Sequence, residues 1–186
     1  PAGDRLYFKL VHAANAPESF RAQPDELSEL RFEGSPIRFG EVLRTRVEHA
    51  GSAGPYVQER LVPPFENPWG ALMALSGIDF LPDGRAAVAT VYGDVWLVGD
   101  LDSESPSWTR YATGMYQPLG LRVVDGKIVV IERGQLTVLE DRNGDDQADV
   151  YHCLNNRWHT TGQPHAFDLC LEVDGDGNFY FFTIYF

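Results

Sequence analysis

The sequence has few cysteines, few basic residues and no long apolar run. Its two cysteines, Cys153 and Cys170, occur in no C-x-x-C or C-x-x-C-H motif, so the sequence lacks the ligand spacing of a structural zinc site and the attachment motif of a c-type haem. No apolar run approaches the roughly 18 residues of a membrane-spanning helix, and the first residues do not form a signal peptide. We therefore expect no membrane span.

The deficit of basic residues argues against a nucleic-acid partner. The chain has 15 Lys and Arg against 27 Asp and Glu, a net charge of -12, whereas nucleic-acid affinity comes mainly from basic side chains that release counterions. Hydrophobic residues make up 44% of the 186 residues, and aromatic residues 12%. This composition predicts a globular protein, either one domain or part of a larger one.

What the sequence does contain is an internal repeat. Residues 77–98, "GIDFLPDGRAAVATVYGDVWLV", and residues 120–141, "GLRVVDGKIVVIERGQLTVLED", both read as strand, Asp-Gly turn, strand, Gly-containing turn and strand. Asp-Gly pairs supply the positive φ angles of tight hairpins. A third copy begins at residue 167, and segments 107–114 and 149–156 are suited to a fourth, outer strand.

The repeat predicts an all-β fold. The first two Asp-Gly turns are 42 residues apart, close to the period of β-propeller blades. We predict a partial β-propeller with two to three four-stranded antiparallel blades at about 77–114, 119–156 and 165–186, the last incomplete. A β-sandwich is the alternative. So few blades would leave sheet edges exposed, so we expect the chain to be a fragment of a longer protein.

The N-terminal part repeats less clearly. We divide the chain into a β-rich lead-in, residues 1–66, and the partial propeller, residues 67–186. Alternation of apolar and polar residues predicts strands in four segments, and Pro24 begins a segment suited to one or two helical turns, 24–30. The four predicted strand segments are 5–11, 28–34, 37–49 and 56–62. The proline-rich segment 62–69 is predicted to be a linker.

The acidic segment 140–153, "EDRNGDDQADVYHC", has two interpretations. The candidate calcium ligands are the side chains of Asp141, Asn143, Asp145 and Asp149 and the backbone carbonyl of Gln147, at alternate positions that suit an oxygen-coordinated ion. In a 12-residue EF-hand loop that begins at Asp141, position 6 would be Asp146 and not glycine, and position 12 would be His152 and not glutamate. The segment is therefore not an EF-hand. The alternative is a solvated turn at Asn143-Gly144. The segment lengthens the repeat between a third and a fourth strand, where an ion would brace a loop.

The segments that lead into the repeats carry the candidate chemistry. Gln-Pro precedes a first strand in "YQPLGLRV", 116–123, and in "GQPHAFDL", 162–169. In a propeller these entries open onto the central channel, which would place His165 near its mouth. An imidazole with a pKa of about 6.5 suits a general base, but first principles favour a histidine that caps a backbone carbonyl or packs in the channel. Arg133, Arg157 and His159 suit contacts with a sugar or a quinone, or a solvated loop.

Four stretches together resemble one protein family. They are "SGIDFLPDGRAAVATVYGDVWLV", "WTRYATGMYQPLGL", "VVDGKIVVIERGQLTVLEDRNGDDQAD" and "HAFDLCLEVDGDGNFYF". They are similar to the glucose/sorbosone dehydrogenase-like β-propellers, and in particular to large exported bacterial proteins that join such a propeller to c-type haem domains. The resemblance covers roughly residues 62–186.

The resemblance implies a six-bladed propeller located in the periplasm or at the cell surface. It further implies pyrroloquinoline quinone (PQQ) and calcium as cofactors, a carbohydrate or alcohol as substrate, and a cytochrome-type electron acceptor with haem c outside this chain. His165 matches the family's catalytic base, whereas the residues that clamp the quinone in relatives would lie in later blades. We therefore expect part of a quinone-dependent sugar or alcohol dehydrogenase-like oxidoreductase. The alternative is a noncatalytic propeller that binds carbohydrate or protein and holds structural calcium.

Overall fold

The computed structural model describes residues 34–51 and 55–184, and their regular structure is entirely β-strand. The strands are β1 (Leu43–Arg44), β2 (Val47–Ala50), β3 (Gln58–Leu61), β4 (Leu75–Phe80), β5 (Ala86–Thr90), β6 (Val95–Gly99), β7 (Ser107–Ala112), β8 (Gly120–Val124), β9 (Lys127–Glu132), β10 (Gln135–Glu140), β11 (Val150–Asn155), β12 (Phe167–Val173) and β13 (Phe179–Ile184). The all-β prediction is confirmed. The described residues contain no helix that could cross a bilayer.

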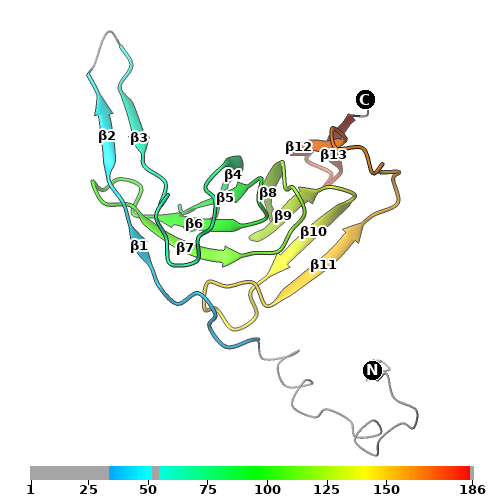
Figure 1. The fold of residues 1–186 in the computed structure, drawn as a ribbon, viewed down its shortest axis with the longest axis horizontal. Helices are drawn as coiled ribbons and strands as arrows, with labels where there is room; N and C mark the ends of the chain where they lie inside the picture. The colour runs from blue at the N-terminus through cyan, green and yellow to red at the C-terminus, as the bar shows by residue number, and fades with distance from the viewer. Residues whose placement is uncertain (1–33, 52–54, 185–186) are drawn as a thin grey trace, which may run out of the picture.

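The strands form two antiparallel sheets and two hairpins (Figure 1). The first sheet has the order β1-β7-β6-β5-β4, and the second sheet has the order β11-β10-β9-β8. The C-terminal hairpin is β12-β13, and β2 pairs with β3. The predicted succession of strands is therefore present in β4–β7 and in β8–β11. The segments proposed as outer strands contain β7 and β11. β11 is the edge strand opposite β8, whereas in the first sheet β1 lies outside β7.

The turns between first and second strands use the predicted Asp-Gly chemistry. Gly84, Gly126 and Gly177 have φ angles of 89°, 75° and 80°, in the region that glycine adopts without steric cost. Each of these turns joins the first strand of a unit to its second strand, β4 to β5, β8 to β9 and β12 to β13. The sequence therefore located these hairpins correctly.

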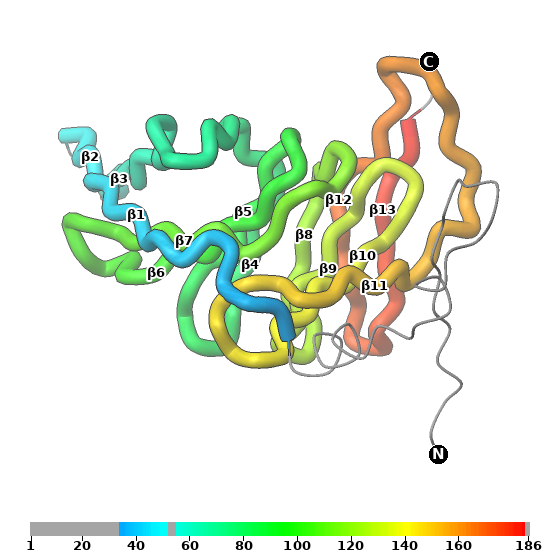
Figure 2. The backbone as a smooth tube through the Cα atoms, turned by 60° about the horizontal axis from the view of Figure 1, so that its bottom comes forward, coloured from blue at the N-terminus to red at the C-terminus, as the bar shows by residue number. Residues whose placement is uncertain are grey.

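Figure 2 shows the units following one another in chain order. Apolar side chains fill the spaces between successive units. Adjacent residues of a strand point to opposite faces. In β9, Ile128 and Val130 pack in the cluster with Ala87 and Ala89 of the first sheet. Val129 and Ile131 pack in the cluster with Leu171 and the aromatic rings of the C-terminal hairpin. The second sheet is thus covered on both faces.

The first strands of the three units lie side by side, β4 against β8 and β8 against β12. Glycine permits this approach, because a Cβ on Gly120 would lie 2.8 Å from backbone atoms of both Cys170 and Leu171. The side chain of Asp79 in β4 also accepts a 2.8 Å hydrogen bond from the backbone N–H of Val123 in β8. Backbone proximity and polar contacts therefore join the units along these strands.

The N-terminal segment is attached to the first sheet. β1 pairs with β7, and Trp69 packs against Trp96 with ring centroids 5.8 Å apart. The segment predicted to be a linker, 62–69, is therefore packed. Predicted segments 37–49 and 56–62 contain β1, β2 and β3. The predicted strand at 5–11, the predicted strand at 28–34 except Gly34, and the predicted helical turns at 24–30 lie outside the described residues.

Candidate functional site

Turns and entry loops from successive units meet along one edge of the molecule. We call this edge the entry-loop rim and define it as turn 91–93, loop 113–119, turn 133–134 and loop 156–166. Met115 N–H donates to the carbonyl of Gly93 at 3.2 Å, and Arg133 N–H donates to the carbonyl of Tyr116 at 2.9 Å. A Cβ on Gly93 would lie 2.3 Å from the Met115 carbonyl oxygen. The rim is thus a continuous surface.

Arg133 lies at the centre of the rim and joins two of its loops. Its Nη1 donates to Tyr116 Oη at 3.3 Å and to Gln117 Oε1 at 3.2 Å. Its Nη2 donates to the carbonyl of Thr161 at 2.7 Å and to the carbonyl of Gln163. Both terminal nitrogens are therefore engaged by protein acceptors. Arg133, as the structure places it, joins loop 113–119 to loop 156–166.

A buried carboxylate, Asp168, fixes the strand that follows the rim. Its side chain is 1% exposed. Oδ2 accepts hydrogen bonds from Gly134 N–H at 2.7 Å and from Trp158 Nε1–H at 3.1 Å, and Oδ1 accepts one from the Thr183 hydroxyl at 2.7 Å. A buried carboxylate needs such donors to offset its lost hydration. Asp168 therefore connects β12, β13, the 133–134 turn and loop 156–166.

Two further buried acids support the rim from the neighbouring strands. Glu132 accepts a 2.8 Å hydrogen bond from Tyr116 N–H, so it holds the loop before β8. Asp94, directly after the 91–93 turn, forms a 2.7 Å ion pair with Arg110. The Arg110 guanidinium also lies over the Phe39 ring, 4.7 Å from its centroid. Glu132 therefore fixes backbone of the rim, and Asp94 holds the side chain of Arg110.

The predicted catalytic residue, His165, occupies the turn in which Ala166 N–H donates to the Gln163 carbonyl at 3.2 Å. The Arg133 guanidinium donates to that same carbonyl. His165 is exposed, and its imidazole forms no hydrogen bond or ion pair with another residue that the structure describes. The geometry therefore gives His165 a fixed backbone and an accessible ring.

The other predicted contact residues also lie in the rim. Arg157 and His159 are exposed in loop 156–166, and Arg157 lines a shallow cavity of about 300 Å³ with residues 153–156. Tyr92, in turn 91–93, and Tyr116, in the adjoining loop 113–119, expose 63% and 57% of their surface. The rim therefore combines accessible aromatic rings with cationic and imidazole groups.

The acidic segment forms the loop between β10 and β11, at the place predicted for the insertion. Its carboxylates accept hydrogen bonds from the loop's own backbone. Asp141 Oδ1 accepts from Gly144 N–H at 2.8 Å, Asp141 Oδ2 from Asp146 N–H at 2.9 Å, and Asp145 Oδ1 from Gln147 N–H at 3.0 Å. In the part of the chain that the structure describes, no three His, Cys, Asp or Glu side chains are grouped as a metal site requires.

The same loop holds the N-terminal segment (Figure 2), where residues 34–39 pass beside it. Gln147 is buried, and its Oε1 accepts hydrogen bonds from Arg38 N–H at 2.8 Å and Phe39 N–H at 3.0 Å. Asp149 accepts from the Ser35 hydroxyl at 3.0 Å. Burial raises the pKa of Asp149, but hydrogen bonds from backbone N–H groups outweigh it and lower the pKa overall. The carboxylate of Asp149, a predicted calcium ligand, and the side chain of Gln147, whose backbone carbonyl was the predicted ligand, thus hold residues 35–39, and we call these contacts the clasp. Asp145 accepts its bond from within the loop.

The "DGDGN" stretch, 174–178, forms the turn of the C-terminal hairpin. Asp174 accepts hydrogen bonds from the Asn178 side chain at 3.0 Å and from the Tyr180 hydroxyl at 2.8 Å. The Asn178 amide and backbone N–H groups lower the pKa of Asp174 to about 2. The carboxylate is therefore an element of the turn.

Sequence reasoning missed the buried acids that support the rim. Asp168 lies within the apolar strand "FDLCL", and Glu132 ends the apolar strand "KIVVIE". A single acid in a strand that is otherwise apolar was the available signal, since a buried charge requires dedicated partners. Some of the partners are distant in the sequence, as Gly134 is from Asp168, and could not be read from it.

Compared with known proteins, the chain matches no protein-family model, no curated protein and no solved structure. The family resemblance therefore stays a prediction.

Proposed function

We propose that the chain is part of a β-propeller whose entry-loop rim binds a small hydroxylated molecule of the carbohydrate or alcohol class. The scaffold part of the proposal is supported by the repeated antiparallel units and by the first strands β4, β8 and β12, which adjoin in sequence order. Radial repetition of four-stranded antiparallel sheets is the defining feature of propellers.

The observation that carries the binding proposal is the composition of the rim. Tyr116 is exposed, yet its hydroxyl accepts a bond from Arg133, whose guanidinium lies 5.5 Å from the ring centroid. The ring is thus oriented before any ligand arrives, which lowers the entropy lost on binding. Apolar rings bordered by a few fixed polar groups are typical of small-molecule sites.

Ligand titration followed by amide NMR tests the binding proposal. A panel of monosaccharides, disaccharides and polyols should include a ligand that shifts the amides of loops 113–119 and 156–166. Tyr116→Ala should weaken binding of that ligand about 5- to 30-fold, because an oriented aromatic contact contributes about 1–2 kcal/mol. Tyr56→Ala is the matched control, since Tyr56 is 83% exposed outside the rim. Equal losses in both variants would refute the site.

A second candidate function, oxidation of the bound hydroxyl, is favoured by the placement of His165. An accessible imidazole beside a binding surface suits removal of a hydroxyl proton. PQQ and calcium enter this candidate through the family resemblance, and PQQ would accept the hydride. Because both terminal nitrogens of Arg133 are engaged by protein acceptors, no cofactor contact is assigned to it.

The oxidation proposal is tested by dye reduction. Protein supplied with PQQ and Ca²⁺ should reduce an artificial electron acceptor in the presence of aldoses or alcohols. His165→Ala should abolish this activity, whereas His152→Ala, a change of the β11 histidine bonded to Glu140, should preserve it. Ligand binding at the rim without dye reduction would support the binding proposal and refute the oxidation proposal.

Calcium at the 141–149 loop is a separate proposal with its own measurement. A chelator should lower the melting temperature of the wild-type protein and leave the melting temperature of Asp145→Ala unchanged. If the chelator has the same effect on both proteins, calcium does not bind at this loop.

A further inference from the structure

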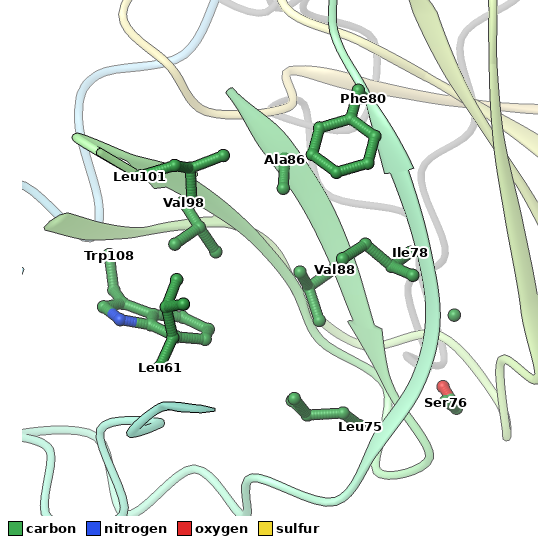
Figure 3. Close-up of a pocket in the computed structure, with 11 residues that line it drawn as sticks. Leu61, Leu75, Ser76, Ile78, Phe80, Ala86, Val88, Val98, Leu101 and Trp108 are labelled. Carbon is green, nitrogen blue, oxygen red and sulfur yellow. The ribbon is translucent and has the colours of Figure 1, made fainter. Parts of the chain in front are cut away.

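The first sheet has one face that no described residue fully covers. A groove of about 520 Å³ runs along β4 between Leu61 and the sheet. Figure 3 shows the side chains of Ile78, Phe80 and Val88 facing this groove. Ile78 and Phe80 expose 55% and 59% of their surface. Contiguous exposed apolar side chains of this size mark interaction surfaces.

The strand register shows what covers the corresponding residues of the second sheet. Phe80 pairs with Ala86 as Val123 pairs with Ile128. Counting back along the strands, Ile78 corresponds to Leu121, which is only 1% exposed in the junction between the two sheets. The open groove is therefore the first sheet's copy of a face that the second sheet buries.

The C-terminal hairpin has the opposite open face. Val173 pairs with Phe179, which aligns β13 with β9 and β5. In this alignment Tyr180 and Phe182 take the places of Val129 and Ile131, which the second sheet buries against the hairpin. Phe182 is 70% exposed. The hairpin thus exposes Tyr180 and Phe182 on the face that each unit uses to contact the unit after it. The groove on the first sheet is the face that each unit uses to contact the unit before it.

We propose that the groove along β4 receives the C-terminal hairpin of a second copy of this chain, in a head-to-tail junction. Phe182 and Tyr180 of one copy would pack on Phe80 and Ile78 of the other. The proposal extends an interface that occurs twice within the chain, between the two sheets and between the second sheet and the hairpin. It is independent of the proposed ligand chemistry.

Head-to-tail contacts use two different surfaces, so they form closed rings or open chains and never a face-to-face dimer through one surface. The hydrophobic effect drives association because the junction removes apolar surface from water. A dimer joined by the Phe80 face of both copies would instead leave both hairpins exposed. The two arrangements therefore respond differently to changes at Phe80 and Phe182.

Sedimentation equilibrium of the full chain tests this. The wild type should show concentration-dependent mass above the 20.8 kDa of one chain. Phe80→Glu and Phe182→Glu should each remain monomeric, because an unpaired carboxylate in an apolar junction should raise the dissociation constant at least about 100-fold. Tyr56→Glu, a change of an exposed aromatic residue away from both faces, should associate like the wild type.

An equimolar mixture of Phe80→Glu and Phe182→Glu gives the decisive result. The first variant keeps an intact hairpin face and the second keeps an intact groove, so the mixture should form a one-to-one dimer and stop there. This recovery also shows that both variants are folded. The proposal would be overturned by a mixture that stays monomeric or by a Phe182→Glu protein that associates alone. A monomeric wild type would also overturn it, because the groove would then be covered by a segment of the same chain.

Discussion

Truncation of Asp168 should destabilise the protein and release the 133–134 turn. Asp168→Ala removes the acceptor of three hydrogen bonds, from Gly134 N–H, Trp158 Nε1–H and the Thr183 hydroxyl. A donor left without a partner costs about 1–3 kcal/mol. Gly134, Trp158 and Thr183 are each partly exposed, so water reaches them after truncation and the lower end applies. We expect a loss of about 3 kcal/mol in the free energy of unfolding.

Urea unfolding followed by circular dichroism measures this loss, and the melting temperature should fall by about 6–12 °C for a chain of this size. Thr183→Val, which removes one of the three donors, should cost about 1 kcal/mol. Hydrogen exchange adds a local readout, because the Gly134 amide should lose its protection in Asp168→Ala and keep it in Thr183→Val. A loss below about 1 kcal/mol in Asp168→Ala, or an unchanged Gly134 exchange rate, would refute the reasoning.

Three further outcomes follow from the described contacts. Arg110→Met should cost about 3 kcal/mol in urea unfolding, because it strands the buried carboxylate of Asp94; adding Asp94→Leu should recover part of that loss. The hydrogen bond to Glu104 raises the pKa of His49, so its stabilisation should be complete below about pH 6.5 and vanish as pH rises through the folded pKa. NMR titration should find that raised pKa, and Glu104→Gln should reduce it. Gln147→Leu should lower the free energy of unfolding by about 1–2 kcal/mol. It should also speed hydrogen exchange of the two backbone amides that donate to the Gln147 side chain, those of Arg38 and Phe39.

The sequence predicted the order of strands well because hairpin turns are local. The Asp-Gly pairs at 83–84, 125–126 and 176–177 determine where the chain reverses, and the glycine φ angles follow from them. The alternation of polar and apolar residues does not identify the two faces of a strand that is buried on both sides. All five residues of β5, "AAVAT", are buried, so no polar residue marks either face and the packing partners of each residue could not be assigned.

The candidate site was harder to predict because it joins residues from separate units. Arg133 was selected for its charge and its position in a turn, but its partners at 161 and 163 lie in the loop that leads to the next unit. The pairing of Asp168 with Gly134 depends on the approach of β12 to the second sheet, which tertiary packing determines. Local patterns therefore located the loops, and only the fold defined which groups in them are accessible.

The clasp and the proposed calcium site share the carboxylate of Asp149. Asp149 Oδ2 accepts the N–H of Arg142 at 2.8 Å, and its Oδ1 accepts bonds from Ser35. An ion that uses the free lone pairs of these oxygens would tighten the loop and stabilise the docked N-terminal segment. An ion that replaces the N–H donors would instead release residues 34–39. Because linkage is reciprocal, the exchange rate of the Phe39 amide with and without Ca²⁺ distinguishes a bracing ion from a competing one.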